Sequence, residues 1–250
     1  MSTIMSTIKK YYSDLIIEAS VPRHADDQII NTCRGFSVIS SSDGVFSYKT
    51  VVTGDPTVMP LKEKQSLLLL CSEIIGQFFQ SANIEKSSKA LVVGLGNPSV
   101  ASDSLGSQVA DRIITDGKQV FSFRPSTKAK TGFETAELVS LVAKQAESDF
   151  IIAIDSLAAR KKERLGTVIQ FSDSGIVPGS GVSASSGEIS CRTMPCPVIS
   201  VGVPTVIGIR DSAVSPLLVT PTSVGSIVES FAVILSGGIN TSIAGNILSR

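Results

Sequence analysis

Short apolar runs alternate with longer periodic segments through most of the chain. The runs are rich in β-branched residues and lack polar alternation, which is typical of strands buried on both faces of a sheet. The segments repeat apolar positions every three or four residues, which is typical of amphipathic helices. The strand-like runs are 90–95, 119–123, 150–155, 167–171, 197–203 and 217–219, and the main helical segments are 63–80, 131–147 and one that begins at 221. This alternation predicts an α/β fold with a mainly parallel central sheet and helices on both faces.

The region before the first helix has a different pattern. Between Gly35 and Met59, apolar and polar residues alternate on both sides of a Ser-Ser-Asp-Gly turn, which predicts a β-hairpin and hence a small N-terminal β segment. Residues 13–19 are acidic and apolar and are interpreted as an edge strand. No linker divides the rest of the chain, so residues 15–250 are expected to form a single domain.

Two further helix assignments depend on local signals. A short helix is expected to turn Leu105, Val109 and Ile113 inward. The sequence from Thr131 to Glu134 fits a capping box, in which the two side chains satisfy backbone N–H groups at a helix start. The expected inner face of that helix is Leu138, Leu141, Val142 and Ala146, and that of the last helix is Val224, Ile227, Phe231, Ile234 and Leu235.

The strongest chemical candidate follows the run Phe150–Ile154. Asp155 comes directly after this run, and a small-residue turn that ends at Arg160 is expected to follow. In open α/β sheets, ligands bind at the carboxyl ends of the parallel strands. Asp155 is therefore either a reactive group at that edge or a helix cap, and this stretch alone does not decide between the two.

A second stretch has the same organisation. The strand that contains Leu91 leads into Gly94-Leu95-Gly96, and Asp103 follows near the start of the next helix. Asp103 is again a candidate for either an N-cap or a reactive group. A dinucleotide-binding fingerprint would need a third glycine in this turn and an acidic residue after the next strand, and the sequence supplies neither.

Two aspartates at one sheet edge suggest two kinds of chemistry. If Asp103 and Asp155 share a crevice, one pKa rises and the pair shares a proton, so that one carboxyl activates water and the other protonates a leaving amine. Alternatively, the two carboxylates hold a divalent metal ion. Glu134 is a candidate third polar group, although the capping box already explains its position.

Composition narrows the function further. Lys plus Arg and Asp plus Glu number 22 each, so the charge balance indicates neither a nucleic-acid nor a membrane partner. His24 is the only histidine, and it lies far in sequence from every buried strand end, which disfavours histidine-based nucleophilic catalysis. The four cysteines lack zinc-site spacing and are expected to be reduced thiols. The N-terminus lacks a signal-peptide core, and the apolar stretches are amphipathic, so a soluble, intracellular protein is expected.

Several motifs resemble those of the germination protease family of spore-forming bacteria. They occur in consistent order over roughly residues 90–240. They are Gly94-Leu95-Gly96-Asn97, Asp103-Ser104-Leu105-Gly106, Thr131-Gly132-Phe133-Glu134-Thr135, Phe150–Arg160, Gln170–Ile176, Pro178–Val182, Pro197–Val206, Leu217–Pro221 and Gly237-Gly238-Ile239-Asn240.

The resemblance implies a fold similar to hydrogenase-maturation peptidases and an endopeptidase that degrades small acid-soluble spore proteins at germination. It implies catalysis by Asp103 and Asp155 without cofactor or metal, and location in the spore core cytoplasm. A homotetramer is implied, whereas direct contact with nucleic acid or membrane is not. The supporting or substrate-binding residues are expected to be Asn97, Gly132, Glu134 and Arg160.

The resemblance also implies a zymogen that trims its own N-terminus. The segment Ser13–Ala19 is similar to the family's processing site, where cleavage follows an acidic residue. The expected bond is Asp14–Leu15, which makes residues 1–14 propeptide-like. Because this segment is similar to the acidic and apolar sites cut in the substrates, it is expected to lie in the protein's own cleft and so to keep the enzyme latent.

The sequence departs from the family pattern at three places. Ser107 stands where the family usually has proline, Ser183-Ala184-Ser185 replaces the usual sequence after the glycine loop, and the region before residue 90 is compact and weakly matched. These departures leave one alternative function open, a non-catalytic relative that binds peptides or regulates a peptidase. A metal-dependent peptidase of the maturation type is a further alternative. The shortage of histidine disfavours the metal-dependent alternative.

Overall fold

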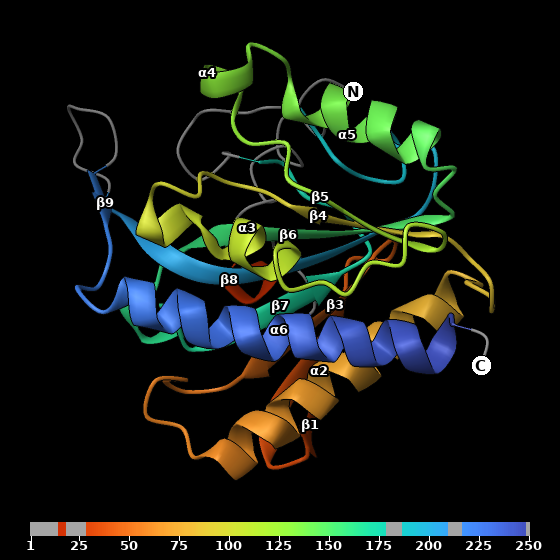
Figure 1. Ribbon diagram of the computed structural model, residues 1–250. Helices are drawn as coiled ribbons and strands as arrows, with labels where there is room; N and C mark the ends of the chain where they lie inside the picture. Colours follow the sequence, from red (N-terminus) through yellow and green to blue (C-terminus); the bar gives the residue numbers. More distant parts are fainter. Residues whose placement is uncertain (1–14, 19–28, 179–186, 210–216, 249–250) are drawn as a thin grey trace.

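The computed structural model describes residues 15–18, 29–178, 187–209 and 217–248 (Figure 1). Within these residues a nine-stranded sheet has the order β1-β2-β3-β7-β8-β6-β4-β5, and β9 also pairs with β8. The strands are β1 Ile29–Cys33, β2 Phe36–Ser42, β3 Ser47–Val52, β4 Ala90–Gly94, β5 Val120–Phe123, β6 Phe150–Ala159, β7 Val168–Ser172, β8 Val198–Ile209 and β9 Leu217–Val219. The helices are α2 Leu61–Ser81, α3 Leu105–Ala110, α4 Lys128–Thr131, α5 Thr135–Gln145 and α6 Val224–Asn246, with 3₁₀ turns η1 Ile16–Glu18, η3 Ala101–Asp103 and η4 Lys162–Arg164.

The sheet is mixed, so the prediction of a mainly parallel sheet is wrong for the sheet as a whole. It is correct for β5, β4, β6 and β8, which are parallel to one another. The pairs formed by β1, β2, β3, β7 and β9 are antiparallel. The short link from β6 to β7 explains part of the difference, because a parallel return needs a crossover of about a dozen residues or more.

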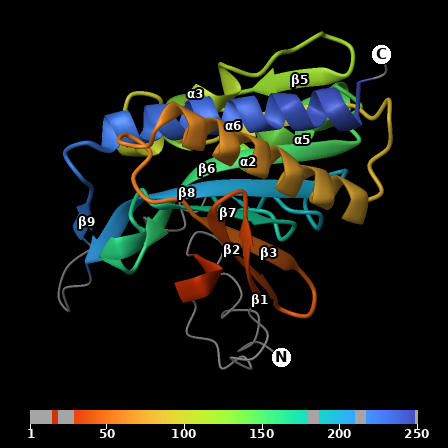
Figure 2. The same cartoon turned by 90° about the horizontal axis from the view of Figure 1, so that it is seen from below.

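Helices cover both faces of the sheet, as predicted. On one face, α2 and α6 lie side by side and pack with α3 onto the sheet, and on the other face α5 covers the strands (Figures 1 and 2). The residues of a central strand are shared between the cores on the two faces, because alternate side chains of a strand point to opposite faces. Ile152 and Ile154 belong to the cluster under α6, whereas Ile151 and Ala153 belong to the cluster under α5.

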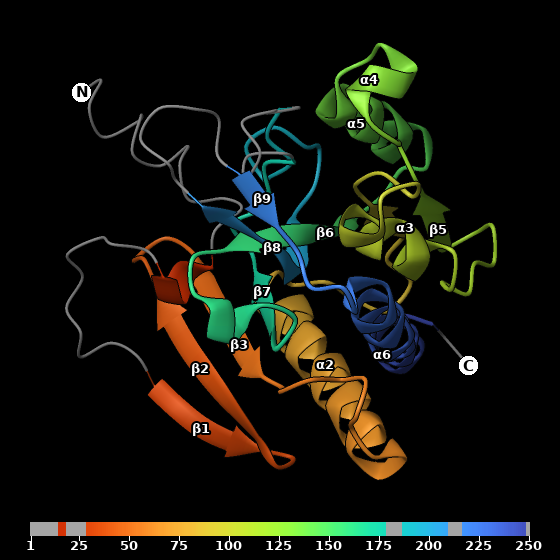
Figure 3. The same ribbon diagram turned by 90° about the vertical axis from the view of Figure 1, so that its left-hand side faces the viewer.

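The expected hairpin is present as β2 and β3, and β1 extends it to form one edge of the sheet (Figure 3). The segment expected as an edge strand instead contains a 3₁₀ turn at Ile16–Glu18. Ser13, Asp14 and Ala19 lie outside the described residues. The predicted inner face of the last helix is confirmed, because all five of its residues are buried in α6.

The predicted capping box is wrong. Thr131 ends α4, and Gly132 adopts a left-handed conformation that separates α4 from α5. The new helix begins at Thr135, and no side chain caps it. Because the helix starts after this turn, its buried stripe is Thr135, Val139 and Ala143, whereas Leu141 of the predicted face is 62% exposed.

Helix α6 is strongly apolar along its length. By length and composition, α6 is the one helix among the described residues that is apolar enough to cross a membrane. In its most apolar window, 61% of the residues are buried within the fold. This burial is typical of a core helix, and α6 packs against α2 and α3 accordingly.

Candidate active site

Asp155 lies at an interior position of its strand, which corrects the prediction of a strand end. β6 continues to Ala159 because β8 pairs with it along its whole second half, so the expected small-residue turn is strand as well. The neighbour on the other side is shorter: Gly94, the last residue of β4, pairs with Ile154. Asp155 is therefore the first residue of β6 beyond the carboxyl end of β4.

This position is a topological switch point. β4 is flanked by β5, reached through α3, and by β6, reached through α5. The chain leaves β4 and β6 in different directions, and such a divergence opens the crevice in which α/β proteins bind ligands. Asp155 lies on β6 at this point of divergence.

Three glycines allow the loop after β4 to pack closely against β6. A side chain at Gly94 would meet the carbonyl oxygen of Gly106 at 2.1 Å, and one at Gly106 would meet that of Ile154 at 2.4 Å. Gly96 has a φ of +93° and lies against Asp103, whose carbonyl oxygen would be 2.1 Å from an added Cβ. These contacts bring the residues that follow β4 onto β6.

Asp103 is the last residue of η3, and its carboxylate closes the glycine loop. Its Oδ2 accepts a hydrogen bond from the backbone N–H of Asn97 at 2.8 Å. Ser104, not Asp103, occupies the N-cap position of α3, so the interpretation of Asp103 as a cap is wrong. The hydroxyl of Thr205 on β8 donates to the carbonyl oxygen of Ser102 at 2.6 Å, which fixes η3 to the sheet.

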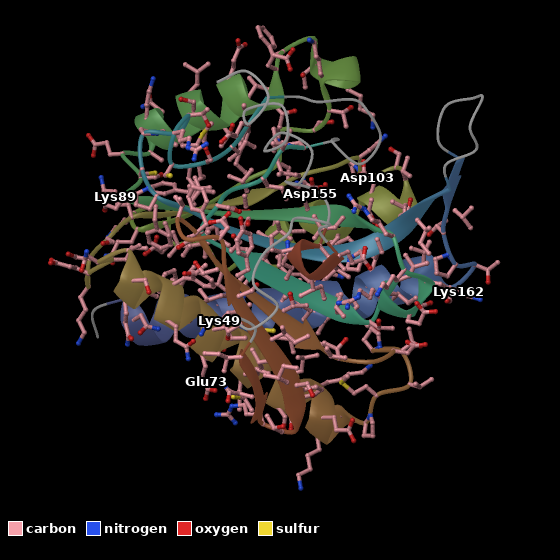
Figure 4. All side chains as sticks on the ribbon, turned by 180° about the vertical axis from the view of Figure 1, so that it is seen from behind. Lys49, Glu73, Lys89, Asp103, Asp155 and Lys162 are labelled. Carbon is pink, nitrogen blue, oxygen red and sulfur yellow. The ribbon has the colours of Figure 1, made fainter. Side chains whose placement is uncertain are left out.

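The two aspartates interact electrostatically. Burial and, to a smaller extent, the charge of Asp103 together raise the pKa of Asp155 to about 8, against the lowering effect of the Ser156 N–H bond. Burial also raises the pKa of Asp103, and the Asn97 N–H opposes this rise. Figure 4 shows the two residues close together, Asp155 on β6 and Asp103 beside it. The carboxyl groups thus form a coupled pair in which Asp155 holds a proton more firmly.

The exposure of the two side chains differs. Asp155 is 5% exposed, and its Oδ1 accepts the N–H of Ser156 at 2.8 Å. Asp103 is only half-buried. The buried carboxyl of Asp155 is neutral at pH 7 and is suited to act as an acid. The more accessible carboxyl of Asp103, which accepts a backbone N–H, is suited to act as a base. Two residues of one type thus take different roles because their environments differ.

Of the supporting residues expected from the sequence, Asn97 is joined to the pair. Besides its N–H bond to Asp103, its side-chain oxygen accepts hydrogen bonds from Ser99 N–H and Lys130 Nζ, both at 3.0 Å. Lys130 is not predictable from the sequence, because an exposed lysine on a short helix has no distinguishing pattern. The structure brings it to the loop that carries Asp103.

Gly132 and Glu134 have no described contact with either aspartate. Gly132 is exposed and ends α4 with a left-handed turn. Glu134 pairs with Lys128 beside that turn. Their described contacts are local to the α4–α5 connection.

Arg160 contacts the N-terminal segment. Its backbone N–H donates to Glu18 Oε2 at 2.5 Å, and its Nη1 donates to the Glu18 carbonyl oxygen at 3.2 Å. Of the expected processing bond, Asp14 lies outside the described residues, and Leu15 is fully buried on the α5 side of the sheet.

The described residues contain no cluster of metal-binding side chains. Among the described residues, no three His, Cys, Asp or Glu side chains converge on one point. All four cysteines are free thiols, as predicted.

Together, these features define an α/β protein with a coupled carboxyl pair at a sheet switch point, an arrangement suited to activating water. The sequence model of the germination protease family matches residues 59–215, which include both aspartates. The chain belongs to the germination protease family.

Individual relatives agree with this assignment. The germination protease of Priestia megaterium is 44% identical over 144 residues, which cover 52% of this chain and 39% of that protein. The germination protease of Bacillus subtilis is 38% identical over 161 residues, 59% of this chain and 43% of that protein. The chain thus matches about two fifths of the length of these relatives.

Proposed function

We propose that this protein is an endopeptidase that uses Asp103 and Asp155 as a proton-sharing pair. The observation that carries the proposal is their electrostatic coupling, which helps to raise the pKa of Asp155 to about 8. At neutral pH the pair then holds one proton, mainly on Asp155, while Asp103 is ionised. The family membership supports a protease, and the pair lies at a sheet switch point, where α/β proteins bind ligands.

The proposed mechanism uses each carboxyl in both roles. Ionised Asp103 accepts a proton from a water molecule as the water oxygen attacks the peptide carbonyl carbon, and Asp155 donates its proton to the carbonyl oxygen. The tetrahedral intermediate then collapses: the proton on Asp103 passes to the leaving amine nitrogen, and Asp155 recovers a proton from the gem-diol. The C–N bond breaks, and the pair returns to its singly protonated state.

The Asn97 N–H and Thr205 keep Asp103 in position through this cycle. The N–H bond favours the ionised form of Asp103, which is the form that a general base requires. The hydroxyl of Thr205 holds the adjacent carbonyl group of Ser102 against β8. Preorganisation of this kind removes reorganisation from the barrier.

The substrates proposed are small acid-soluble spore proteins, in the spore core cytoplasm, with the enzyme assembled as a homotetramer. These proposals rest on the family resemblance. Light scattering of the purified protein measures the assembly: a mass near four times 26.2 kDa supports the tetramer, and a monomer mass contradicts it.

Cleavage of a small acid-soluble spore protein tests the proposed catalytic pair. Asp103→Asn and Asp155→Asn are each expected to reduce cleavage by about a thousandfold or more, because each step needs both carboxyl groups. Circular dichroism checks that both variants fold. Wild-type activity in either folded variant would exclude the pair, and loss of wild-type activity in a chelator would favour a metal-dependent peptidase.

The proposed self-processing removes residues 1–14 and leaves 15–250 as the peptidase domain. Mass spectrometry of aged or mildly acidified protein is expected to show loss of these residues in the wild type but not in Asp155→Asn. An N-terminus that stays intact in the wild type would contradict the proposal.

A further inference from the structure

We propose that Lys130 is a positioning residue for the carboxyl pair and that it acts on Asp103 through Asn97. The proposal rests on the proposed function of that pair. Its basis is a series of hydrogen bonds that begins on α4 and ends at the carboxylate of Asp103. Lys130 and Ser99, which it also contacts, lie outside the motifs that resemble the germination protease family.

The ammonium group of Lys130 contacts two residues of the loop that follows β4. Its Nζ donates to the side-chain oxygen of Asn97 at 3.0 Å and to the hydroxyl of Ser99 at 3.2 Å. An ammonium group has three N–H donors, so one lysine holds both acceptors at once. The contact joins α4 to a loop more than thirty residues earlier in the chain, at distances of 33 and 31 residues.

Asn97 transmits this contact to Asp103. Its side-chain oxygen also accepts the N–H of Ser99 at 3.0 Å, which closes a tight turn in the loop. Its carbonyl oxygen accepts the N–H of Val100 at 3.0 Å. The side chain and the backbone of Asn97 are therefore both held, and its N–H is directed at Asp103 Oδ2, 2.8 Å away.

Helix α4 is itself fixed to the start of α5. The hydroxyl of Thr131 donates to the carbonyl oxygen of Phe133 at 3.3 Å and accepts the N–H of the same residue at 3.2 Å. Lys128 forms an ion pair with Glu134 on the other side of this turn. Lys130 thus extends from a supported turn, which allows its side chain to hold the loop in place.

The effect on Asp103 has a predictable sign. The charged groups with a described connection to Asp103 are Asp155, its partner in the pair, and Lys130, which reaches it through Asn97. The Asn97 N–H bond favours the ionised form of Asp103 and lowers its pKa. Loss of Lys130 loosens this bond, so the pKa of Asp103 is expected to rise.

The expected effect on turnover is moderate and separable from stability. Lys130 is exposed, and exposed charged contacts contribute little to the free energy of folding. The position of a general base acts directly on the barrier of the reaction, however. Removal of Lys130 is therefore expected to lower kcat by about five- to tenfold with little change in KM or in stability.

Two lysines on the same short helix give a matched comparison. Lys130→Met removes the donors and keeps an unbranched side chain, whereas Lys128→Met removes an ammonium group that pairs with Glu134. Steady-state kinetics with a small acid-soluble spore protein are expected to show the loss of kcat in Lys130→Met and near wild-type values in Lys128→Met. Lys130→Arg keeps N–H donors and is expected to retain most of kcat. Equal losses in the two methionine variants would overturn the proposal.

A double-mutant cycle tests whether Lys130 acts through Asn97. Asn97→Ala keeps the backbone N–H that binds Asp103 but removes the oxygen that Lys130 binds. In this background Lys130→Met is expected to change kcat by less than about twofold. A full loss of kcat in the same background would show that Lys130 acts by another route.

Titration of Asp103 tests the proposal without proteolysis. NMR of folded protein labelled at the aspartate carboxyl carbons follows the titration, and Asp103→Asn assigns the resonance. The pKa of Asp103 is expected to be higher in Lys130→Met than in the wild type and Lys128→Met, and an unchanged pKa would overturn the positioning role. A higher pKa together with active Asp103→Asn and Asp155→Asn enzymes would uphold the positioning role and exclude the proposed chemistry. An unchanged pKa together with inactive aspartate variants would do the reverse.

Discussion

Thr205 donates its hydroxyl to the carbonyl oxygen of Ser102 at 2.6 Å, and thereby joins the middle of β8 to the turn that ends in Asp103. Thr205 is 1% exposed, and its own carbonyl oxygen accepts the hydroxyl of Thr220. The hydrogen bond crosses from the strand beside β6 to the loop beyond β4. It therefore helps to set the position of Asp103 relative to Asp155.

Removal of this hydroxyl is expected to reduce turnover more than substrate binding. Thr205→Val keeps the shape but loses the bond, so kcat is expected to fall by about tenfold with little change in KM, because Asp103 shifts relative to Asp155. Thr205→Ser keeps the donor and is expected to restore most of kcat. If kcat fell equally in both variants, in proportion to the loss of stability, Thr205 would contribute only packing.

Gly96 gives a test of the loop with a matched control. In Gly96→Ala, the new methyl group meets Asp103 at 2.1 Å and displaces it, so kcat/KM is expected to fall by about a hundredfold. Gly117 also has a positive φ, +67°, but no atom lies within 4 Å of an added Cβ. Gly117→Ala is therefore expected to cost about 1 kcal/mol of stability at unchanged activity. Similar kinetic losses in both variants would show that backbone strain alone matters.

The raised pKa of Asp155 gives a signed dependence of stability on pH. Between its ordinary value of 3.8 and about 8, the folded protein holds a proton that the unfolded chain releases, so stability falls as pH rises through this window. Asp155→Asn removes this pH-dependent loss of stability, because asparagine does not ionise. The variant is expected to be more stable than the wild type at pH 9, by a few kcal/mol, with the difference vanishing toward pH 4. Denaturant unfolding at several pH values measures it.

Asp116 provides the control of opposite sign. Backbone N–H groups of Val120, Lys118 and Gln119 lower the pKa of Asp116 to about 2. The ionised side chain therefore stabilises the fold at pH values above the ordinary aspartate pKa of 3.8, and this stabilisation is lost as pH falls toward 2. Asp116→Asn is expected to be less stable than the wild type at neutral pH. A difference between Asp155→Asn and wild type that does not change with pH would contradict the burial of an ionisable group at position 155.

The same pKa predicts the pH profile of proteolysis. kcat/KM is expected to fall above about pH 8, where Asp155 loses the proton that it donates. On the acid side it falls as Asp103 becomes protonated, at a pKa above the ordinary aspartate value. Initial rates with a small acid-soluble spore protein from pH 4 to 10 measure both limbs. A rate that keeps rising above pH 9 would assign the proton donor to another group.

Much of the fold was predictable because its signals are local. The buried runs predicted β4, β6 and β7, and the two aspartates stood out because each follows such a run. The end of β6 was not predictable. Ser156–Ala159 are small or apolar residues that extend as strand only because β8, which follows much later in the chain, pairs with them.

The residues that support the site also depend on contacts between segments that are distant in the sequence. Thr205 is a single polar residue within an apolar strand, a signal that the sequence contained but whose partner it did not reveal. Glu18 belongs to a short acidic and apolar segment that was interpreted as a strand, yet its carboxylate is bound by N–H groups of residues 160 and 161. Such contacts arise from chain topology, and no local pattern encodes them.

The most direct test of the account is a double-mutant cycle on the carboxyl pair. kcat/KM for a small acid-soluble spore protein is measured in the wild type, in Asp103→Asn, in Asp155→Asn and in the double variant. If the two carboxyl groups act as one unit, each single variant loses about a thousandfold or more and the double variant loses no more than the worse single variant. Losses that multiply in the double variant, or wild-type activity in either single variant, would contradict a shared catalytic proton.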